Sequence, residues 1–167
     1  MPIQGFPTAE ARLVTDALER SLERVVVAMQ PPIPGLGPVI RLFGPLGEAL
    51  MWVVALDNHL RAADPTYEAR PDADPHGQAL LGLRFARNKT VHGVLVAAFF
   101  YGGAAVGLIQ LGNAGLGQAP SCRWRPGGQL QAAHDDLREA YDIHVSGREL
   151  LSILNPAVAF LRSEAGT

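Results

Sequence analysis

The stretch from Arg84 to His92 contains the side chains of this sequence that are best suited to chemistry. Arg84, Arg87 and Lys89 precede His92 within a segment whose flanks are apolar. Charged groups are costly to place beside an apolar core unless they are paired or used. We therefore interpret the stretch as a site for an anion, most simply a phosphate.

An arginine and a histidine can cleave RNA without a metal, because RNA carries its own nucleophile, the 2′-hydroxyl next to the scissile phosphate. A histidine exchanges protons close to neutral pH, so His92 can act as base or acid. Arg87 stays charged and can present two N–H groups to phosphate oxygens, while the Asn88 amide can orient the phosphate or ribose. We predict catalytic roles for Arg87, His92 and Asn88, and substrate contacts from Arg84, Lys89 and Thr90.

An arginine followed by a histidine at a similar spacing, with five intervening residues instead of four, also occurs at residues 70–76 and 138–144. Pro71 and Pro75 prevent the first match from forming a single helical element. Acidic neighbours make the second match typical of a solvated helix face. Arg87-Asn88-x3-His92 is the match with an amide after the arginine and apolar flanks, so we assign the site there.

Arg87-Asn88-x3-His92 resembles the signature of the HEPN superfamily, in which an arginine and a small polar residue precede a histidine. Residues 48–52 and 138–148 resemble segments that flank the motif in bacterial members. The resemblance implies a helical bundle and a metal-independent ribonuclease, with no cofactor, whose active site forms at a two-fold dimer interface. A dimer also supplies the second histidine that one-step acid and base catalysis needs. The expected products have 2′,3′-cyclic phosphate and 5′-hydroxyl ends.

Other interpretations of the motif remain open. The chain could be a non-catalytic HEPN-like module that binds or dimerises, engaging a protein or nucleic-acid partner, for example an antitoxin in a toxin–antitoxin or antiviral defence system. Alternatively, Arg87 and His92 could simply pair with carboxylates of the preceding helix, such as Asp57 or Glu48.

Composition sets the broad class of the protein. A chain of 167 residues predicts one domain, residues 1–167, that buries about 70% of its unfolded surface. The single cysteine, Cys122, excludes an internal disulfide and a cysteine-rich metal site. A start without a basic and apolar leader predicts a cytoplasmic protein. A net charge of −2 does not favour a protein that grips many phosphates, although an enzyme that contacts one or two needs no excess of base.

Hydrophobic periodicity predicts a mainly all-α fold with a small β-hairpin insertion at about residues 104–126, and the resemblance to the HEPN superfamily implies that the helices form an up-and-down bundle. Strands are expected at 104–111 and 121–125, joined by a glycine-rich turn. A loop rich in proline is expected at 31–38, a short turn of helix near 39–43, and an acidic loop without a metal site at 64–75. The expected helices are 8–29, about 46–63, about 76–100, 129–145, a turn or two at 148–154 and a last helix capped by Asn155-Pro156.

Residues 93–111 contain no charge and approach the length that spans a bilayer. Glycines interrupt the segment, and no basic or aromatic belt marks both ends. We therefore predict the end of a buried helix and a buried strand, and a membrane is an unlikely partner.

Overall fold

The structure is a computed structural model that describes residues 9–30, 37–101, 104–106, 121–130 and 136–167. The helices are α1 (Ala9–Met29), α2 (Gly37–Ala63), α3 (Ala69–Ala73), α4 (Ala79–Val91), α5 (Asp136–His144) and α6 (Leu150–Ala165). The strands are β1 (Ala97–Tyr101), β2 (Ala104–Val106) and β3 (Ser121–Trp124), and a 3-10 turn, η1, spans Gly127–Gln129. The prediction of a mainly helical fold with a small antiparallel sheet is confirmed.

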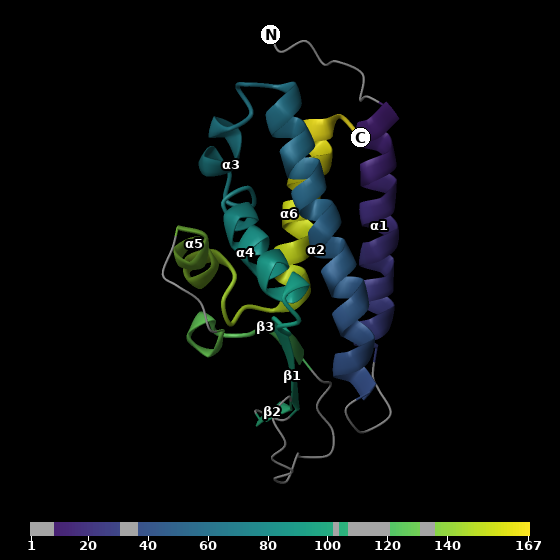
Figure 1. Ribbon diagram of the computed structural model, residues 1–167, viewed down its shortest axis with the longest axis vertical. Coiled ribbons are helices and arrows are strands. Elements are labelled where there is room, and N and C mark those ends of the chain that lie inside the picture. The colour runs from purple at the N-terminus through teal and green to yellow at the C-terminus, as the bar shows by residue number, and fades with distance from the viewer. Residues whose placement is uncertain (1–8, 31–36, 102–103, 107–120, 131–135) are drawn as a thin grey trace.

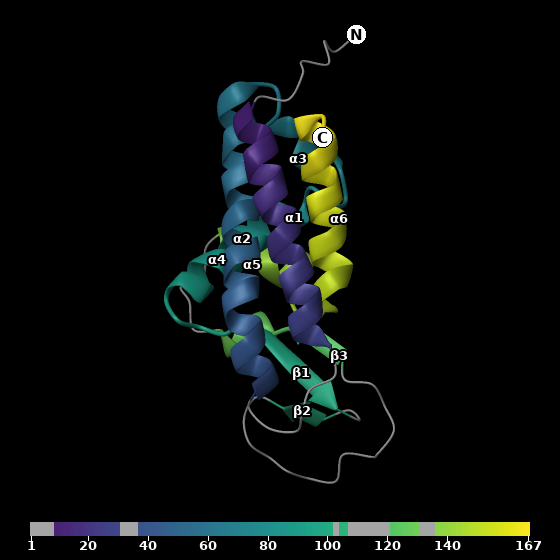
Figure 2. The same ribbon diagram turned by 90° about the vertical axis from the view of Figure 1, so that its right-hand side faces the viewer.

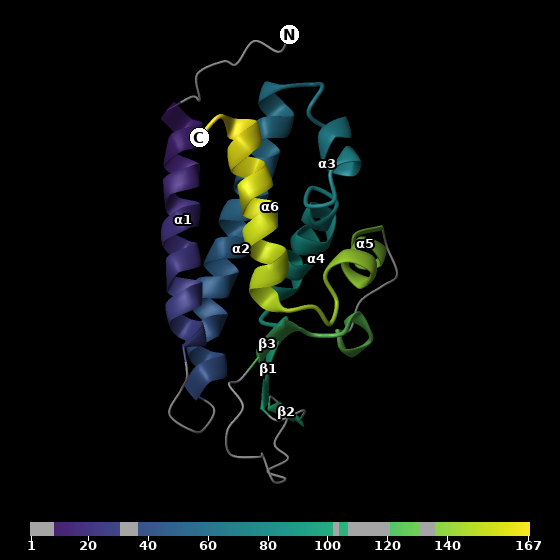
Figure 3. The same cartoon turned by 180° about the vertical axis from the view of Figure 1, so that it is seen from behind.

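Helix α2 lies at the centre of the arrangement (Figure 1). It packs against α1 on one side and α4 on the other, and it also contacts α6 and β1. Seen from behind, α6 runs between α1 and the pair formed by α4 and α5 (Figure 3). One cluster of buried apolar side chains joins these helices to the sheet, and its largest members include Trp124, Tyr67, Tyr141 and Phe99.

Helix α1 confirms the predicted helix over its described residues, Ala9–Met29. Leu18 and Val25 lie seven positions apart and are fully buried, as the helical period of the apolar residues requires. The helix runs antiparallel to α2, and Arg24 forms a 2.5 Å ion pair with Glu48 across the two. Figure 2 shows α1 lying along α2 over most of its length.

Helix α2 begins earlier than we predicted. The expected short turn at 39–43 and the helix start at residue 46 are wrong, because a single helix begins at Gly37 and continues through Pro45 to Ala63. A proline inside a helix removes one backbone hydrogen bond. Leu42 and Leu46 flank Pro45 and are each 1% exposed, and their burial offsets that loss. Of the predicted loop, residues 31–36 lie outside the described residues.

The predicted acidic loop at 64–75 contains a short helix, α3. Two features order the residues before α3. The Thr66 N–H donates a hydrogen bond to the Asp64 carboxylate at 2.8 Å, and the Tyr67 side chain is buried, with 1% of its surface exposed. Arg70 then pairs with both Asp64 and Glu164, which ties this connection to α6. The segment is therefore ordered by local hydrogen bonds and by one buried aromatic side chain.

Helix α4 ends earlier than we predicted, at Val91 and not near residue 100. Gly93 adopts a left-handed conformation with φ of 76°. Its N–H donates to the Thr90 carbonyl at 2.9 Å, and the Val94 N–H donates to the Lys89 carbonyl at 3.0 Å. This pair of hydrogen bonds is the Schellman motif, which terminates helices at a glycine.

The sheet pairs different strands from those we predicted. Its order is β2-β1-β3, so Ala97–Tyr101, expected to be helical, forms the central strand. Phe99 lies opposite Cys122 on one side and opposite Val106 on the other. The predicted pairing of 104–111 with 121–125 is therefore wrong, and residues 107–120, including the expected turn, lie outside the described residues. None of the described helices combines the length and apolar character needed to cross a bilayer.

The C-terminal helices also differ from the prediction. Helix α5 occupies Asp136–His144, within the expected 129–145, whereas residues 131–135 lie outside the described part. The expected break at Pro156 is wrong, because α6 is continuous from Leu150 to Ala165. Leu154 and Ala157, on either side of the proline, are fully buried, and this packing holds the helix together despite the missing hydrogen bond.

Candidate functional site

The three cationic side chains of α4 have different surroundings. The Arg84 guanidinium donates to the Asp57 carboxylate and, at 2.8 Å, to the Asn58 side-chain carbonyl. The Lys89 ammonium lies 5.4 Å from the centre of the Phe85 ring. Arg87 is half-buried, and within the described part of the chain no carboxylate lies at ion-pair distance from it. Of the two arginines on α4, Arg87 is therefore the one whose guanidinium can pair with an external anion.

Asp57 accounts for the position of Arg84. Its carboxylate is 2% exposed and also accepts hydrogen bonds from Arg61 at 3.3 Å and from the Tyr67 hydroxyl at 3.0 Å. Burial raises the pKa of Tyr67, and the Asp57 charge raises it further, so the phenol stays protonated and donates. The alternative in which Asp57 or Glu48 neutralises Arg87 is wrong, because Asp57 binds Arg84 and Glu48 binds Arg24.

His92 is the residue at which α4 ends. Its side chain is exposed, and its backbone, with φ of −86° and ψ of 17°, has left the helical conformation. The His92 N–H donates to the Lys89 carbonyl at 3.1 Å. Among the described residues, no carboxylate lies at ion-pair distance from the imidazole. Arg87 and His92 thus occupy the last turns of one helix and are both open to solvent.

The remaining predicted site residues are Asn88, which is partly accessible, and Thr90, which is buried. Asn88 is half-buried, and its backbone carbonyl accepts from the His92 N–H at 3.3 Å. Thr90 is 9% exposed, and its hydroxyl donates to the Ala86 carbonyl at 2.9 Å. A Cβ atom at Gly47 would lie 3.0 Å from the Thr90 methyl, so α2 and α4 approach closely there. This packing contradicts a substrate contact by Thr90.

Apolar side chains lie exposed on the two helices that approach at Thr90. Val91, one residue after Thr90, is 60% exposed, and Met51, four residues after Gly47, is 57% exposed. An antiparallel α2–α4 pair with this contact places both near the end of α4 that holds the motif. Large apolar side chains beside an accessible arginine are typical of a surface that another molecule covers.

The arginines of the two other Arg-His matches are both bonded to carboxylates, and Arg138, predicted to lie on a solvated face, is 18% exposed. Arg70 is engaged by Asp64 and Glu164, and α3 ends at Ala73, before His76. Arg138 donates to Asp142 one turn along α5 at 2.8 Å. In contrast to Arg87, both arginines are neutralised by carboxylates of the same chain.

Sequence reasoning missed the residue that fixes the segment after His92. Arg125 follows β3, and its N–H donates to the Val96 carbonyl at 2.8 Å while its guanidinium donates to the Leu95 carbonyl at 3.0 Å. The Tyr141 hydroxyl in turn donates to the Arg125 carbonyl at 2.7 Å. The alternation in Ser121–Arg125 indicated a strand, but it carried no signal for this contact.

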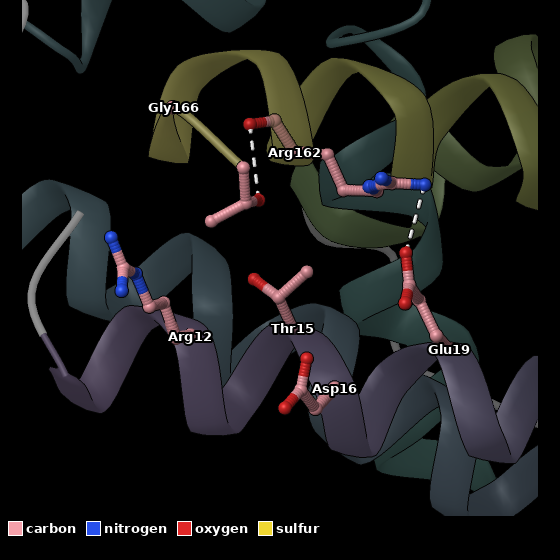
Figure 4. A pocket seen from close by; sticks show the side chains of 7 residues that line it. Arg12, Thr15, Asp16, Glu19, Arg162 and Gly166 are labelled. Carbon is pink, nitrogen blue, oxygen red and sulfur yellow. Dashed lines mark hydrogen bonds and ion pairs between the residues drawn. The ribbon is translucent and has the colours of Figure 1, made fainter. Parts of the chain in front are cut away.

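A separate cavity lies between α1 and the end of α6 (Figure 4). It measures about 490 Å³, and its lining includes Arg12, Asp16 and Thr15. Glu19 and Arg162 face each other across it and form a 2.8 Å ion pair. None of the predicted site residues lines this cavity.

Among the described residues, no group of three or more histidine, cysteine, aspartate or glutamate side chains is arranged to hold a metal ion. The groups that are at least partly accessible near the end of α4 include the Arg87 guanidinium, the Asn88 amide and the His92 imidazole. Comparisons of the chain with family models, with curated proteins and with solved structures find no match.

Proposed function

We propose that this protein is a metal-independent endoribonuclease that acts as a homodimer, with Arg87 and His92 as its catalytic pair. The observation that carries the proposal is the contrast along α4. Arg84 is held by a buried carboxylate, whereas Arg87 and His92 are accessible and have no carboxylate at ion-pair distance in the described chain. An accessible cation and an accessible titratable group near the same end of one helix suit a phosphodiester.

In the proposed reaction the 2′-hydroxyl attacks the adjacent phosphorus, and the bond to the 5′-oxygen breaks. An imidazole removes the 2′-proton, and a second imidazole protonates the leaving 5′-oxygen. The Arg87 guanidinium stabilises the extra negative charge on the phosphorane oxygens, and the Asn88 amide orients the phosphate or ribose. The products are a 2′,3′-cyclic phosphate and a 5′-hydroxyl.

The need for two imidazoles explains why we propose a dimer. Each chain supplies one His92, and a two-fold axis close to the end of α4 brings two together. The exposed side chains of Met51 and Val91 support an interface on the α2–α4 face, because an isologous contact would cover them.

A second candidate function follows from the same exposed side chains. A protein partner, such as an antitoxin, could cover Met51 and Val91 and use Arg87 as an anchor for a carboxylate. In that case the chain is a binding module of a toxin–antitoxin or defence system and does not cleave RNA.

The test is incubation with total RNA in the presence of a chelator, followed by analysis of the fragment ends. We expect Arg87→Ala and His92→Ala to abolish cleavage while leaving thermal unfolding and dimer mass unchanged. Arg138→Ala and His144→Ala are matched controls, because they remove a pair of the same residue types from α5. Fragments produced equally by all five proteins, or by none of them, would refute the ribonuclease.

A further inference from the structure

Arg125, the residue that follows β3, is a cation that the fold holds without a carboxylate. Its guanidinium donates to the Leu95 carbonyl at 3.0 Å and to the Gln129 carbonyl at 3.4 Å. The residue is half-buried, and within the described ranges no carboxylate lies at ion-pair distance from it. A guanidinium carries five N–H donors, so the two carbonyls leave further N–H groups and an uncompensated positive charge for an anion.

Backbone hydrogen bonds also fix the position of Arg125. Its N–H donates to the Val96 carbonyl at 2.8 Å, and its carbonyl accepts from the hydroxyl of the buried Tyr141 at 2.7 Å. A guanidinium that is already held in place loses less conformational entropy when it binds a ligand. Arg125 is therefore better prepared to bind an anion than an arginine that moves freely on the surface.

Arg125 and His92 both lie toward the side of α4 that faces α5. His92 follows Phe85 by seven positions, about two turns, so the two residues share one side of the helix. The Phe85 ring packs against the Tyr141 ring with centroids 5.1 Å apart, and the Tyr141 hydroxyl bonds Arg125. The Leu95 carbonyl that Arg125 binds comes three residues after His92, a length of chain that spans at most about 11 Å. A cation from outside α4 thus lies near the proposed imidazole.

We propose that Arg125 binds a second phosphate of the RNA, next to the phosphate on which His92 acts. This inference rests on the proposed ribonuclease and adds to it a substrate-binding residue from outside the motif. Arg87 lies three positions before Thr90, which packs on α2, and is therefore on the α2 side of the helix. The RNA strand crosses the end of α4 from Arg87 to Arg125, with His92 between the two guanidinium groups.

The test uses a fluorescein-labelled single-stranded RNA whose 2′-hydroxyls are methylated, so that it binds without being cleaved. Fluorescence anisotropy measures its Kd over a range of salt concentrations. We expect Arg125→Gln to raise the Kd about tenfold and to lower the slope of log Kd against log salt concentration by about 0.7, the value for one phosphate contact on a single strand. With cleavable RNA the same variant should raise KM and leave kcat unchanged, because His92 is untouched.

Arg125→Lys separates phosphate binding from a purely structural role. Both Arg125→Gln and Arg125→Lys remove the guanidinium that bridges Leu95 and Gln129, so both should lower the unfolding temperature. Lysine keeps the charge, however, and should keep the salt slope of the parent. Arg20→Gln is the control for net charge, because Arg20 is exposed on α1, on the other side of α2 from α4. It should bind the oligonucleotide like the parent.

The inference is overturned if the parent does not bind the oligonucleotide, or if Arg125→Gln binds it as the parent does. It is also overturned if Arg125→Lys loses as much of the salt slope as Arg125→Gln, or if Arg20→Gln weakens binding equally. A parent that binds through Arg125 but cleaves no RNA would contradict the ribonuclease alone and would support the phosphate contact.

Discussion

The buried carboxylate of Asp57 on α2 accepts a hydrogen bond from the guanidinium of Arg84 on α4, 27 positions later in the sequence. The Tyr67 hydroxyl and Arg61 donate to the same carboxylate. A single acidic side chain therefore joins α2 to α4 and to the connection before α3.

Asp57→Ala should destabilise the fold by about 2–4 kcal/mol. The substitution leaves the Tyr67 hydroxyl buried without its acceptor, and it removes the partner of Arg84. The Arg84 and Arg61 side chains are 21% and 27% exposed, so water replaces part of the loss and the lower half of the range is expected. Urea unfolding measures the effect. Asp72→Ala, at an exposed position of α3, should stay within about 0.5 kcal/mol of the parent, and equal losses in both variants would contradict the role of Asp57.

Gly93→Ala should cost about 1 kcal/mol, because φ of 76° is strained for a residue with a Cβ atom. The same variant should lower RNA cleavage, since the turn sets the position of His92. Gly128→Ala is the control: its φ is not positive, and its added Cβ meets no atom within 4 Å. A Gly93→Ala protein as stable as the control would show that the turn is not strained by a side chain.

Gly82→Ala should cost about 1–3 kcal/mol. The new Cβ would lie 2.7 Å from a Val145 methyl and 3.0 Å from the Tyr141 Cα, where α4 meets α5. The methyl can rotate away, but the backbone of α5 must shift. Thermal unfolding should show a larger loss than in Leu81→Ala, at the adjacent exposed position. A larger loss of stability in Leu81→Ala than in Gly82→Ala would mean that α5 accommodates the new methyl group without strain.

Stability should fall steeply in alkaline solution because of Cys122. Burial raises the pKa of its thiol from 9.0 to about 12, and the Glu149 charge adds to the effect. In the unfolded chain the thiol loses its proton near pH 9, whereas the folded chain retains it until about pH 12. The contribution of this thiol is therefore complete below pH 9 and declines above it, by about 1.4 kcal/mol per pH unit. Cys122→Ala should show a correspondingly shallower decline in urea unfolding between pH 9 and 11, and parallel curves would contradict the assignment.

The sequence predicted the elements whose period was long and regular. Helix α1 is an example, since its stripe of Leu18 and Val25 is buried as expected. It did not predict continuity through Pro45 and Pro156, because local propensity treats proline as a break, whereas burial of the neighbouring leucines is a tertiary effect. The end of α4 was missed for another reason. Gly93 after a basic last turn is a helix stop signal, and the long apolar run beyond it concealed that signal.

The candidate site was only partly predictable. The residue types and spacing predicted Arg87 and His92 as site residues, and the acidic neighbours of Arg138 predicted a solvated face, whereas the Arg138 side chain is 18% exposed and donates to Asp142. The sequence could not show that Asp57 would choose Arg84 over Arg87, because both arginines lie within a turn of each other on α4. It also could not show that the Arg125 guanidinium donates to the Leu95 carbonyl, because this hydrogen bond depends on how the strands pair.

The reversal of the chain at Gly93 has a consequence for how the proposed pair is held. Arg87 is carried by a helix whose neighbours are α2 and α5, whereas His92 stands at a joint leading to β1. The His92 N–H still donates to carbonyls of the last turn of α4, so the helix sets the backbone position of His92, and a bend at Gly93 would move the sheet without changing the spacing of Arg87 and His92 along the helix.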